Sequence, residues 1–420
     1  MLHSFKKPRQ IHSSHLRVTR RQCHIRILFL ILLSVLLVRG LLGTLQKRSD
    51  KATKVIPPDF DALGLSAEFV LERIGHPIPL VSADDFRNGP YQFERGLGAG
   101  KEGSVDLYTN RISGENVVLK RYGDSPEVSW APVPSFINQT DDVIPRQWPA
   151  EITSGLVVEA ICNTEPVRDK FVPLREFFFG TLDGRQKSRA WHLVMPMMSK
   201  GSVGKLAGDL RLERSSDVRD LDLQFRPAYE GILAVLARLH AKDICHDDIH
   251  KGNILVHDDI TQWSLGDYGQ VRGVAHPYHR TQFWTEGRQW TKCKLNDVRR
   301  SLKLYMEFLR NACDNPEQFD AEFFAGRTPW SRLYWEYFQS PTSAQFLIDL
   351  SRSHTPESVP VVPGPSGAPP GLVPLRAFTN FSNVRRIAID LELSTKFMGS
   401  KMRTWSNLAL FGWDIETVAV

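Results

Sequence analysis

The sequence predicts an α+β fold, in which a region rich in strands is followed by a region of amphipathic helices. Strand-like apolar runs are concentrated between residues 92 and 198, and turn-forming residues separate them, as at Ser113-Gly114. Helical periodicity is clearest in residues 226–242 and 297–312. A block of strands followed by a block of helices is the pattern expected of an α+β domain.

The composition is that of an ordinary globular chain of 420 residues, 42% apolar and 24% charged. These fractions exclude wholesale disorder, collagen and coiled coil, and a mean hydropathy of −0.26 excludes a polytopic membrane protein. Five cysteines are too few for a disulfide scaffold. The net charge of +6 comes from a basic tail, residues 1–26, which holds seven Lys or Arg and no acid; without it the chain carries about −1. We therefore expect no nucleic-acid partner.

An apolar segment at residues 27–45, interrupted by Arg39, predicts a membrane anchor. Its 19 residues fall within the roughly 17–25 that a spanning helix needs. Arg39 lies near the far end, from which a long side chain can reach the interface. Two alternatives remain open. A cleaved secretory signal fits the twelve uninterrupted apolar residues at its start, and a mitochondrial presequence fits the Arg-rich, acid-free tail.

The charges beside this segment favour a type II orientation, with a cytoplasmic N-terminus and the bulk of the chain on the far side of the membrane. Over 20-residue flanks, six Lys or Arg precede the segment and four follow it. Glycosylation sequons at Asn138 and Asn380 are compatible with this placement but are too common to establish it. We therefore expect a single-pass membrane protein of the ER or Golgi lumen or of the cell surface.

Two stretches are expected to connect other parts of the chain. Residues 46–85 are polar with scattered prolines and predict a stem between the anchor and the folded part. Residues 355–375 contain seven prolines and three glycines, a density that neither a helix nor a strand tolerates.

Helical spacing runs through residues 150–162, so a helix is expected within the strand-rich region.

A glycine-rich turn at Gly98, Gly100 and Gly103 is the first pattern that indicates chemistry. Glycines allow a strand–turn–strand backbone to lie close over phosphate groups, because no Cβ protrudes. Lys120 follows on a later strand-like run, 15 residues after Val105. Each feature alone also fits an ordinary hairpin and a solvated lysine, so neither establishes a nucleotide site.

The C-terminal half carries a stronger pattern. Asp248 and Asn253 lie five residues apart after an amphipathic helix, and Asp267 follows 14 residues after Asn253. One carboxylate can accept a hydroxyl proton, while an amide oxygen and a second carboxylate are hard ligands for Mg²⁺. A zinc site formed by His246, Asp248 and His250 is an alternative, but it leaves Asn253 and Asp267 without a role.

In this order the motifs resemble those of the protein-kinase family, over roughly residues 92–312. The correspondences are the Gly-rich loop at the glycine turn, the strand lysine at Lys120, the catalytic loop from His246 to Asn253, and the D-F-G motif as Asp267-Tyr268-Gly269. The resemblance implies a two-lobed fold. A small β-rich lobe would span residues 86–198, and a larger helical lobe would span 199–420 with the Pro-rich residues 355–375 as an insertion.

The resemblance also implies a role for each motif residue, with ATP and Mg²⁺ as cofactors. Lys120 would hold the ATP phosphates and pair with a helix glutamate, for which Glu159 is preferred over Glu151 because it lies mid-helix. Asp248 would be the catalytic base. Asn253 and Asp267 would hold the magnesium. The nucleotide pocket would be lined by Leu97, Gly98, Gly100, Gly103, Val105, Lys120, Met195 and Met197.

Two acidic residues beyond the D-F-G position also fit the family, and two positions depart from it. Asp297 resembles the buried aspartate of the helix after the activation segment, and Glu286 lies about where the A-P-E glutamate belongs. Asp247 replaces the usual Arg before the catalytic Asp, and His250 replaces the Lys two residues after it. Because a carboxylate at position 247 would repel a phosphate, we expect no need for activation-segment phosphorylation.

The function that these features predict is transfer of the ATP γ-phosphate to a protein Ser or Thr hydroxyl. A small-molecule or glycan kinase of the same fold is an alternative, because the H-x-D-x-H-x-G-N pattern also resembles the aminoglycoside and choline kinase branch. A pseudokinase that binds partners is another. Every residue that the chemistry requires is present, which favours an active enzyme.

Overall fold

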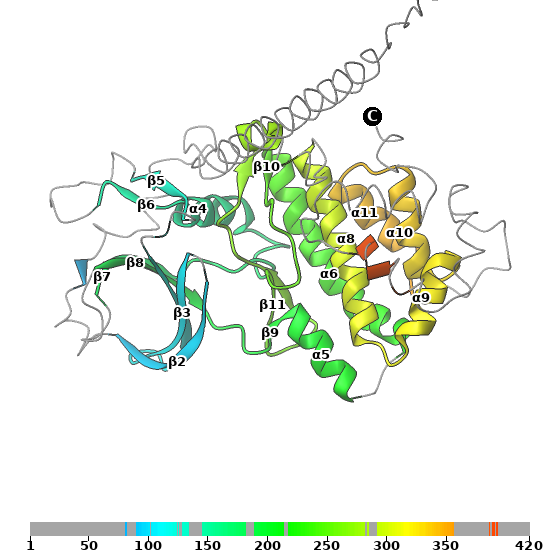
Figure 1. Cartoon of the computed structure of the whole chain (residues 1–420), viewed down its shortest axis with the longest axis horizontal. Coiled ribbons are helices and arrows are strands. Elements are labelled where there is room, and N and C mark those ends of the chain that lie inside the picture. Colours follow the sequence, from blue (N-terminus) through cyan, green and yellow to red (C-terminus); the bar gives the residue numbers. More distant parts are fainter. Residues whose placement is uncertain are drawn as a thin grey trace, which may run out of the picture. The chain divides into compact units, whose positions relative to one another are not determined.

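Figure 1 shows a computed structural model of the chain. The structure describes residues 80–81, 90–100, 102–123, 125, 128–133, 145–181, 189–213, 217–281, 284, 292–356, 386, 389–390 and 392–393. All of these belong to the unit Lys54–Val420. The basic tail, the anchor at 27–45, most of the stem, both sequons, Glu286 and nearly all of residues 355–375 lie outside the described residues. Within the described residues, no helix has both the length and the apolar character that crossing a membrane requires.

A six-stranded sheet forms the first part of the described fold, with the order β1-β7-β8-β4-β3-β2. All neighbouring strands are antiparallel except β1 and β7, which run parallel. In β4 the apolar residues Val117 and Leu119 are buried in alternation, as expected of a strand with one covered face. The strands are β1 (Leu80–Val81), β2 (Tyr91–Ala99), β3 (Gly103–Asn110), β4 (Asn116–Tyr122), β7 (Glu176–Gly180) and β8 (Ala190–Pro196).

One helix, α4 (Ala150–Cys162), follows directly on the hairpin of β5 (Trp130–Pro132) and β6 (Gln147–Pro149). Ile152 and Leu156 of α4 belong to the same buried apolar cluster as Trp191 of β8. At Gly155 an added Cβ would lie only 2.4 Å from the Leu174 side chain, so the helix approaches its neighbours too closely for any larger residue. With α4 packed in this way, Glu151 of its first turn contacts Lys120 and Tyr122 of β4.

Helices make up the second part of the described fold, and α6 lies at their centre, in contact with both α8 and α11. Its face packs into a large core in which Phe225 stacks on Trp263 and Tyr229 stacks on Tyr305. The helices, coloured green to orange in Figure 1, are α5 (Val203–Glu213), α6 (Val218–Ala241), α8 (Cys293–Ala312), α9 (Pro316–Ala325), α10 (Pro329–Gln339) and α11 (Ala344–Ser353).

Two small sheets carry the loops that hold the predicted motifs. One has the order β12-β11-β9 and the other pairs β10 with β13. The motif from His246 to Asn253 lies between β10 and β11, and Asp267 follows β12 by two residues. These strands are β9 (Gly201–Ser202), β10 (Ile244–Cys245), β11 (Ile254–Val256), β12 (Trp263–Leu265) and β13 (Arg272–Gly273), and the short helix η1 (Pro277–Arg280) follows β13.

The predicted α+β arrangement, strands first and helices afterwards, is confirmed, and it is compatible with a two-lobed kinase-like fold. Within the strand-like runs expected between residues 92 and 198, β7 begins only at Glu176, and Phe171 instead bridges to Leu265. Pro173 has no N–H for a sheet ladder, which explains the interruption. Helix α6 begins eight residues before the expected residue 226, because the Asp217 side chain caps it by accepting two backbone N–H groups.

Candidate active site

The glycine-rich turn is the hairpin between β2 and β3, closed by a hydrogen bond from Gly100 N to Gly103 O of 2.8 Å. The glycines of this turn differ in what would surround an added Cβ. An added Cβ on Gly103 would lie 1.7 Å from the carbonyl oxygen of Arg121, so packing against β4 excludes any side chain. Gly98 and Gly100 have nothing within 4 Å of an added Cβ. Their bare backbone therefore borders open space, as a phosphate-binding turn requires.

The strand lysine pairs with Glu151, not with Glu159, and this corrects the prediction. Lys120 Nζ lies 2.5 Å from Glu151 Oε2 on the first turn of α4. The Tyr122 hydroxyl donates to the same carboxylate oxygen at 2.5 Å. Glu159 is also buried but lies two turns further along the helix. The first turn is the one that packs against β4, so it provides the partner.

Two more carboxylates converge on Lys120. Glu102, on the glycine-rich turn, places Oε2 3.0 Å from Lys120 Nζ. An added Cβ on Gly269 would lie 3.5 Å from Asp267 Oδ1, 3.7 Å from Glu151 Oε2 and 3.9 Å from Glu102 Oε2. Burial alone would lower the pKa of Lys120, but the charges around it, that of Glu151 first, hold this pKa well above its ordinary value. Lys120 therefore stays protonated at neutral pH.

The predicted catalytic loop is held in place by the buried carboxylate of Asp297 on α8. This carboxylate accepts hydrogen bonds from the backbone N–H of His246 at 2.7 Å and of Asp247 at 2.9 Å, and it lies 3.1 Å from His240 Nε2. Although burial tends to raise the pKa of Asp297, its hydrogen bond to His240 keeps it below the ordinary value. Asp297 thus occupies the buried position in the helix that the sequence predicted for it.

Asp248, the predicted base, is placed by groups on several sides. Asn253 Nδ2 donates to the Asp248 carbonyl at 2.9 Å, and it lies 3.4 Å from Oδ2. His250 Nε2 lies 3.7 Å from Oδ2, and Arg300 Nη2 lies 3.9 Å from Oδ1. Burial raises the pKa of Asp248, but the hydrogen bond and charge of His250 and the charge of Arg300 outweigh it and lower this pKa to about 2. The carboxylate is therefore anionic at neutral pH.

The donor set around Asn253 and Asp267 fits Mg²⁺ better than Zn²⁺. An amide oxygen and a carboxylate are the hard ligands that Mg²⁺ prefers, and the Gly266 N–H donates to the Asn253 carbonyl at 2.9 Å, which ties the two loops together. In the zinc alternative His246 would be a ligand. Its Nδ1 already accepts from the Asp248 N–H at 3.4 Å, and its Nε2 lies 3.2 Å from the Gly266 carbonyl oxygen. Both ring nitrogens of His246 are thus engaged.

Tyr268, at the position of the D-F-G phenylalanine, is buried and held by its hydroxyl. That hydroxyl accepts from the Val172 N–H at 2.9 Å and lies 2.7 Å from the Leu265 carbonyl oxygen. The preceding Asp267 has φ of 59°, a left-handed conformation that aspartate adopts more readily than most residues. These hydrogen bonds hold Tyr268 in place at the start of the segment that follows β12, and they thereby restrict the position of its neighbour Asp267.

The remaining predicted nucleotide residues lie on β2, β3 and β8, except Met197, which directly follows β8. Val105 stands opposite Lys120 in the β3–β4 pair, so both side chains are on the same face of the sheet. Leu97 is exposed on β2, and Met195 packs against the cluster that contains Trp191. The Met197 N–H donates to the Asn116 carbonyl at 3.3 Å, so this donor is already used within the protein.

A disulfide that was not predicted from the sequence links Cys245 and Cys293, whose Cα atoms lie 6.0 Å apart. It joins β10, immediately before the catalytic loop, to the first residue of α8, and both cysteines are buried. The signal lay in the positions of the two cysteines, one beside His246 and the other four residues before Asp297. Glu102, Tyr122 and Arg300 were missed as well, because their contacts join segments that are distant in sequence.

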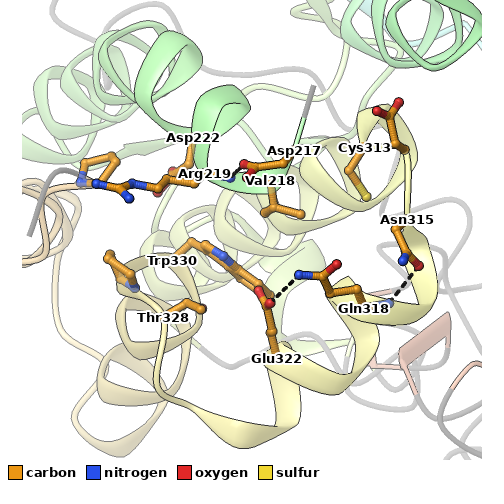
Figure 2. Close-up of a pocket in the computed structure, with 13 residues that line it drawn as sticks. Asp217, Val218, Arg219, Asp222, Cys313, Asn315, Gln318, Glu322, Thr328 and Trp330 are labelled. Atoms are coloured by element: carbon orange, nitrogen blue, oxygen red, sulfur yellow. Dashed lines mark hydrogen bonds between the residues drawn. The ribbon is translucent and has the colours of Figure 1, made fainter. Parts of the chain in front are cut away.

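A cavity lies away from this site, between the start of α6 and helices α9 and α10. It has a volume of about 370 Å³ and contains none of the candidate catalytic residues. Figure 2 shows that its polar lining groups are used in local hydrogen bonds: Gln318 Nε2 donates to Glu322 at 2.8 Å, and Asn315 Oδ1 caps α9 through the Gln318 N–H. Asp217 caps α6, Asp222 pairs with Arg226 and Glu322 accepts from Gln318, so we assign no chemistry to this cavity.

Comparison with known proteins gives limited support for the fold. No family model matches the chain. The serine/threonine-protein kinase BCK1/SLK1/SSP31 of Saccharomyces cerevisiae is 24% identical over 269 residues, which cover 62% of this chain. The chain spans about 15% of the length of that protein. This partial similarity agrees with a kinase-like fold, and it suggests phosphotransfer without identifying a substrate.

Proposed function

We propose that the chain is an ATP- and Mg²⁺-dependent phosphotransferase that acts on a protein Ser or Thr hydroxyl. The main support for the proposal is that charged groups from two separate regions of the chain, one around Lys120 and one around Asp248, are held in defined positions. Lys120 is paired with Glu151 beside the glycine-rich turn and close to Asp267. Asp248 is held by Asn253 in the loop that Asp297 fixes. These groups are the parts that phosphoryl transfer requires.

In this mechanism the β2–β3 turn covers the ATP phosphates, and the ammonium group of Lys120 contacts their oxygens. Asn253 and Asp267 would hold Mg²⁺, which neutralises phosphate charge when it is bound. Asp248 accepts a hydrogen bond from the substrate hydroxyl and so orients its oxygen toward the γ-phosphorus. As the new P–O bond forms and the bond to the ADP oxygen breaks, the hydroxyl proton passes to Asp248. With a pKa of about 2, Asp248 acts mainly by orientation and takes the proton late.

The test is phosphate transfer from γ-labelled ATP by the purified full-length chain, with Asp248→Asn as the control. We expect this variant to retain ATP binding and to lose turnover by orders of magnitude. Lys120→Met should impair productive ATP binding, and Asp267→Ala should abolish Mg²⁺-dependent turnover. Wild-type turnover in any of the three variants would refute the assignment.

The geometry at His250 favours one second candidate, a kinase that acts on a small molecule or glycan. His250 lies beside the catalytic carboxylate, at the position where its pattern resembles aminoglycoside and choline kinases. Panels of proteins, sugars and amino alcohols offered to the same enzyme separate the two substrate classes. ATP binding without transfer to any panel would instead support a pseudokinase.

We also propose that the catalytic part lies in the lumen of the secretory pathway or outside the cell, anchored by residues 27–45. The Cys245–Cys293 disulfide supports this, because disulfides persist mainly in oxidising compartments. Protease protection in sealed microsomes tests the placement. Digestion of the catalytic part in the absence of detergent would show that this part faces the cytoplasm, which is the opposite topology.

A further inference from the structure

The Asp247 side chain is buried in a cluster of charges that the proposed chemistry does not use. Its side chain is 1% exposed, and Oδ2 lies 2.7 Å from His279 Nε2 and 3.4 Å from Arg272 Nη1. Both partners are 3% exposed and belong to the segment that follows Asp267. The cluster therefore joins the catalytic loop to that segment inside the protein.

The backbone of Asp247 is held as firmly as its side chain. Its N–H donates to Asp297 Oδ1 at 2.9 Å, and its carbonyl accepts from Arg300 Nη1 at 2.6 Å. Its φ is 63°, which places it in the left-handed region. A buried carboxylate is costly unless it is paired, so the folded loop is stable only while His279 and Arg272 are in place.

A covalent link constrains the same segment at its far end. The Cys245–Cys293 disulfide closes the chain between β10 and α8, and the rings of Tyr278 and Trp284 pack with the two cysteines. Tyr268 fixes the beginning of the segment through its hydroxyl. The segment is thus attached to the rest of the fold at its start, at Asp247 and at Cys293.

We infer that Asp247 is a positioning residue that holds the segment after Asp267 in its working position through His279 and Arg272, without a phosphate on that segment. The inference rests on the proposed function. The loop and the segment already complement each other, with the Asp247 carboxylate on the loop and the Arg272 guanidinium and the His279 ring on the segment. A phosphate added beside Asp247 would meet a like charge.

Asp247→Asn in the full-length chain tests this, because Asn tolerates the left-handed region and removes only the charge. Asp243→Asn is the matched control. Asp243 also has a positive φ, of 57°, and pairs with Lys294 of α8 at 2.6 Å, but its side chain is 73% exposed. We expect Asp247→Asn to speed amide hydrogen exchange in residues 270–281 about tenfold or more. Its kcat should fall about tenfold with an unchanged KM for ATP, and the control should change neither quantity.

His279→Gln tests the same contact from its other side, and it can be used even if Asp247→Asn does not fold. It should reproduce both effects, and the double variant should be no worse than either single one. Unchanged exchange in residues 270–281 in both variants would overturn the inference. So would loss of most activity when phosphatase treats the native enzyme. A wild-type chain that transfers no phosphate would refute the proposed function, and the exchange comparison would still decide the role of Asp247.

Discussion

At the residue scale, the protonation states of the site are set by individual neighbours. Asp248 has its pKa lowered from 3.8 to about 2, with His250 and Arg300 opposing the effect of burial. A carboxylate whose folded pKa is depressed stays charged until the pH falls through that value, so Asp248 is ionised throughout the neutral and mildly acidic range. Lys120 is held protonated by the carboxylates around it. Both groups therefore carry their working charge without adjustment at neutral pH.

The choice of helix glutamate gives a prediction at this scale. Glu151→Gln removes a charged partner of Lys120 at 2.5 Å, and loss of a hydrogen bond to a charged group costs about 1.5–3 kcal/mol, roughly 10- to 100-fold. We expect kcat/KM for ATP to fall by that factor. Glu159→Gln, a change of the same kind on the same helix, should reduce kcat/KM much less. A larger loss of kcat/KM in Glu159→Gln than in Glu151→Gln would contradict the assignment of Glu151 as the partner of Lys120.

The sequence predicts Lys120, Asp248, Asn253 and Asp267 as site residues because the order and spacing of their motifs along the chain are the signal. The partner of Lys120 could not be chosen in this way. A mid-helix position favoured Glu159, but the partner is decided by which turn of α4 docks against β4, and that depends on packing such as the contact between Gly155 and Leu174. Contacts of this kind join residues that are far apart in sequence and carry no local pattern.

At the element scale, the described residues that follow Asp267 contact the charge cluster at Asp247 through Arg272 and His279. His279 Nε2 faces the Asp247 carboxylate, and its Nδ1 lies 3.2 Å from the Val274 carbonyl oxygen. The nearby Arg272 is a like charge, and the rings of Trp284 and His276 lie beside that of His279. Burial would lower the pKa of His279, but the hydrogen bond and charge of Asp247 raise it above 6.5.

This shift predicts how stability depends on pH. A histidine with a raised folded pKa contributes stability that is fully present below its unfolded pKa, near 6.5, and that is lost as the pH rises through the folded pKa. The melting temperature of the wild type should therefore exceed that of His279→Gln most at about pH 6. The difference should shrink as the solution becomes alkaline. A difference that grows with pH would contradict the pairing.

The disulfide gives a second prediction for the same element. Cys245 and Cys293 are 48 residues apart, and closing a loop of that length stabilises the fold by about 4 kcal/mol in the chain-entropy account. Cys293→Ser should lower the free energy of unfolding by an amount of this order. Cys162→Ser alters a buried free cysteine and serves as the control that leaves the disulfide intact. If reducing agent lowers the melting temperature of the Cys293→Ser variant as much as that of the wild type, the bond does not stabilise the fold.

At the scale of the whole molecule, α4 links the sheet to the helices. Its residues Ile152 and Leu156 belong to the core under the sheet, while Val157 and Val158 belong to the core of the helices. The helix that carries Glu151 is thus packed into both parts. The α+β class followed from the order of strand-like and helix-like periods, whereas a helix that belongs to two cores could not be inferred from one apolar face.

We propose that Asp248 and the Lys120–Glu151 pair serve one phosphoryl transfer. The most direct test is single-turnover transfer of labelled γ-phosphate from ATP by the full-length chain with Mg²⁺, compared with Asp248→Asn at equal ATP occupancy. We predict transfer to a Ser or Thr hydroxyl by the wild type, and a rate lower by about two to four orders of magnitude in the variant. Equal rates in the two proteins, or no transfer by a wild type that binds ATP, would contradict the account.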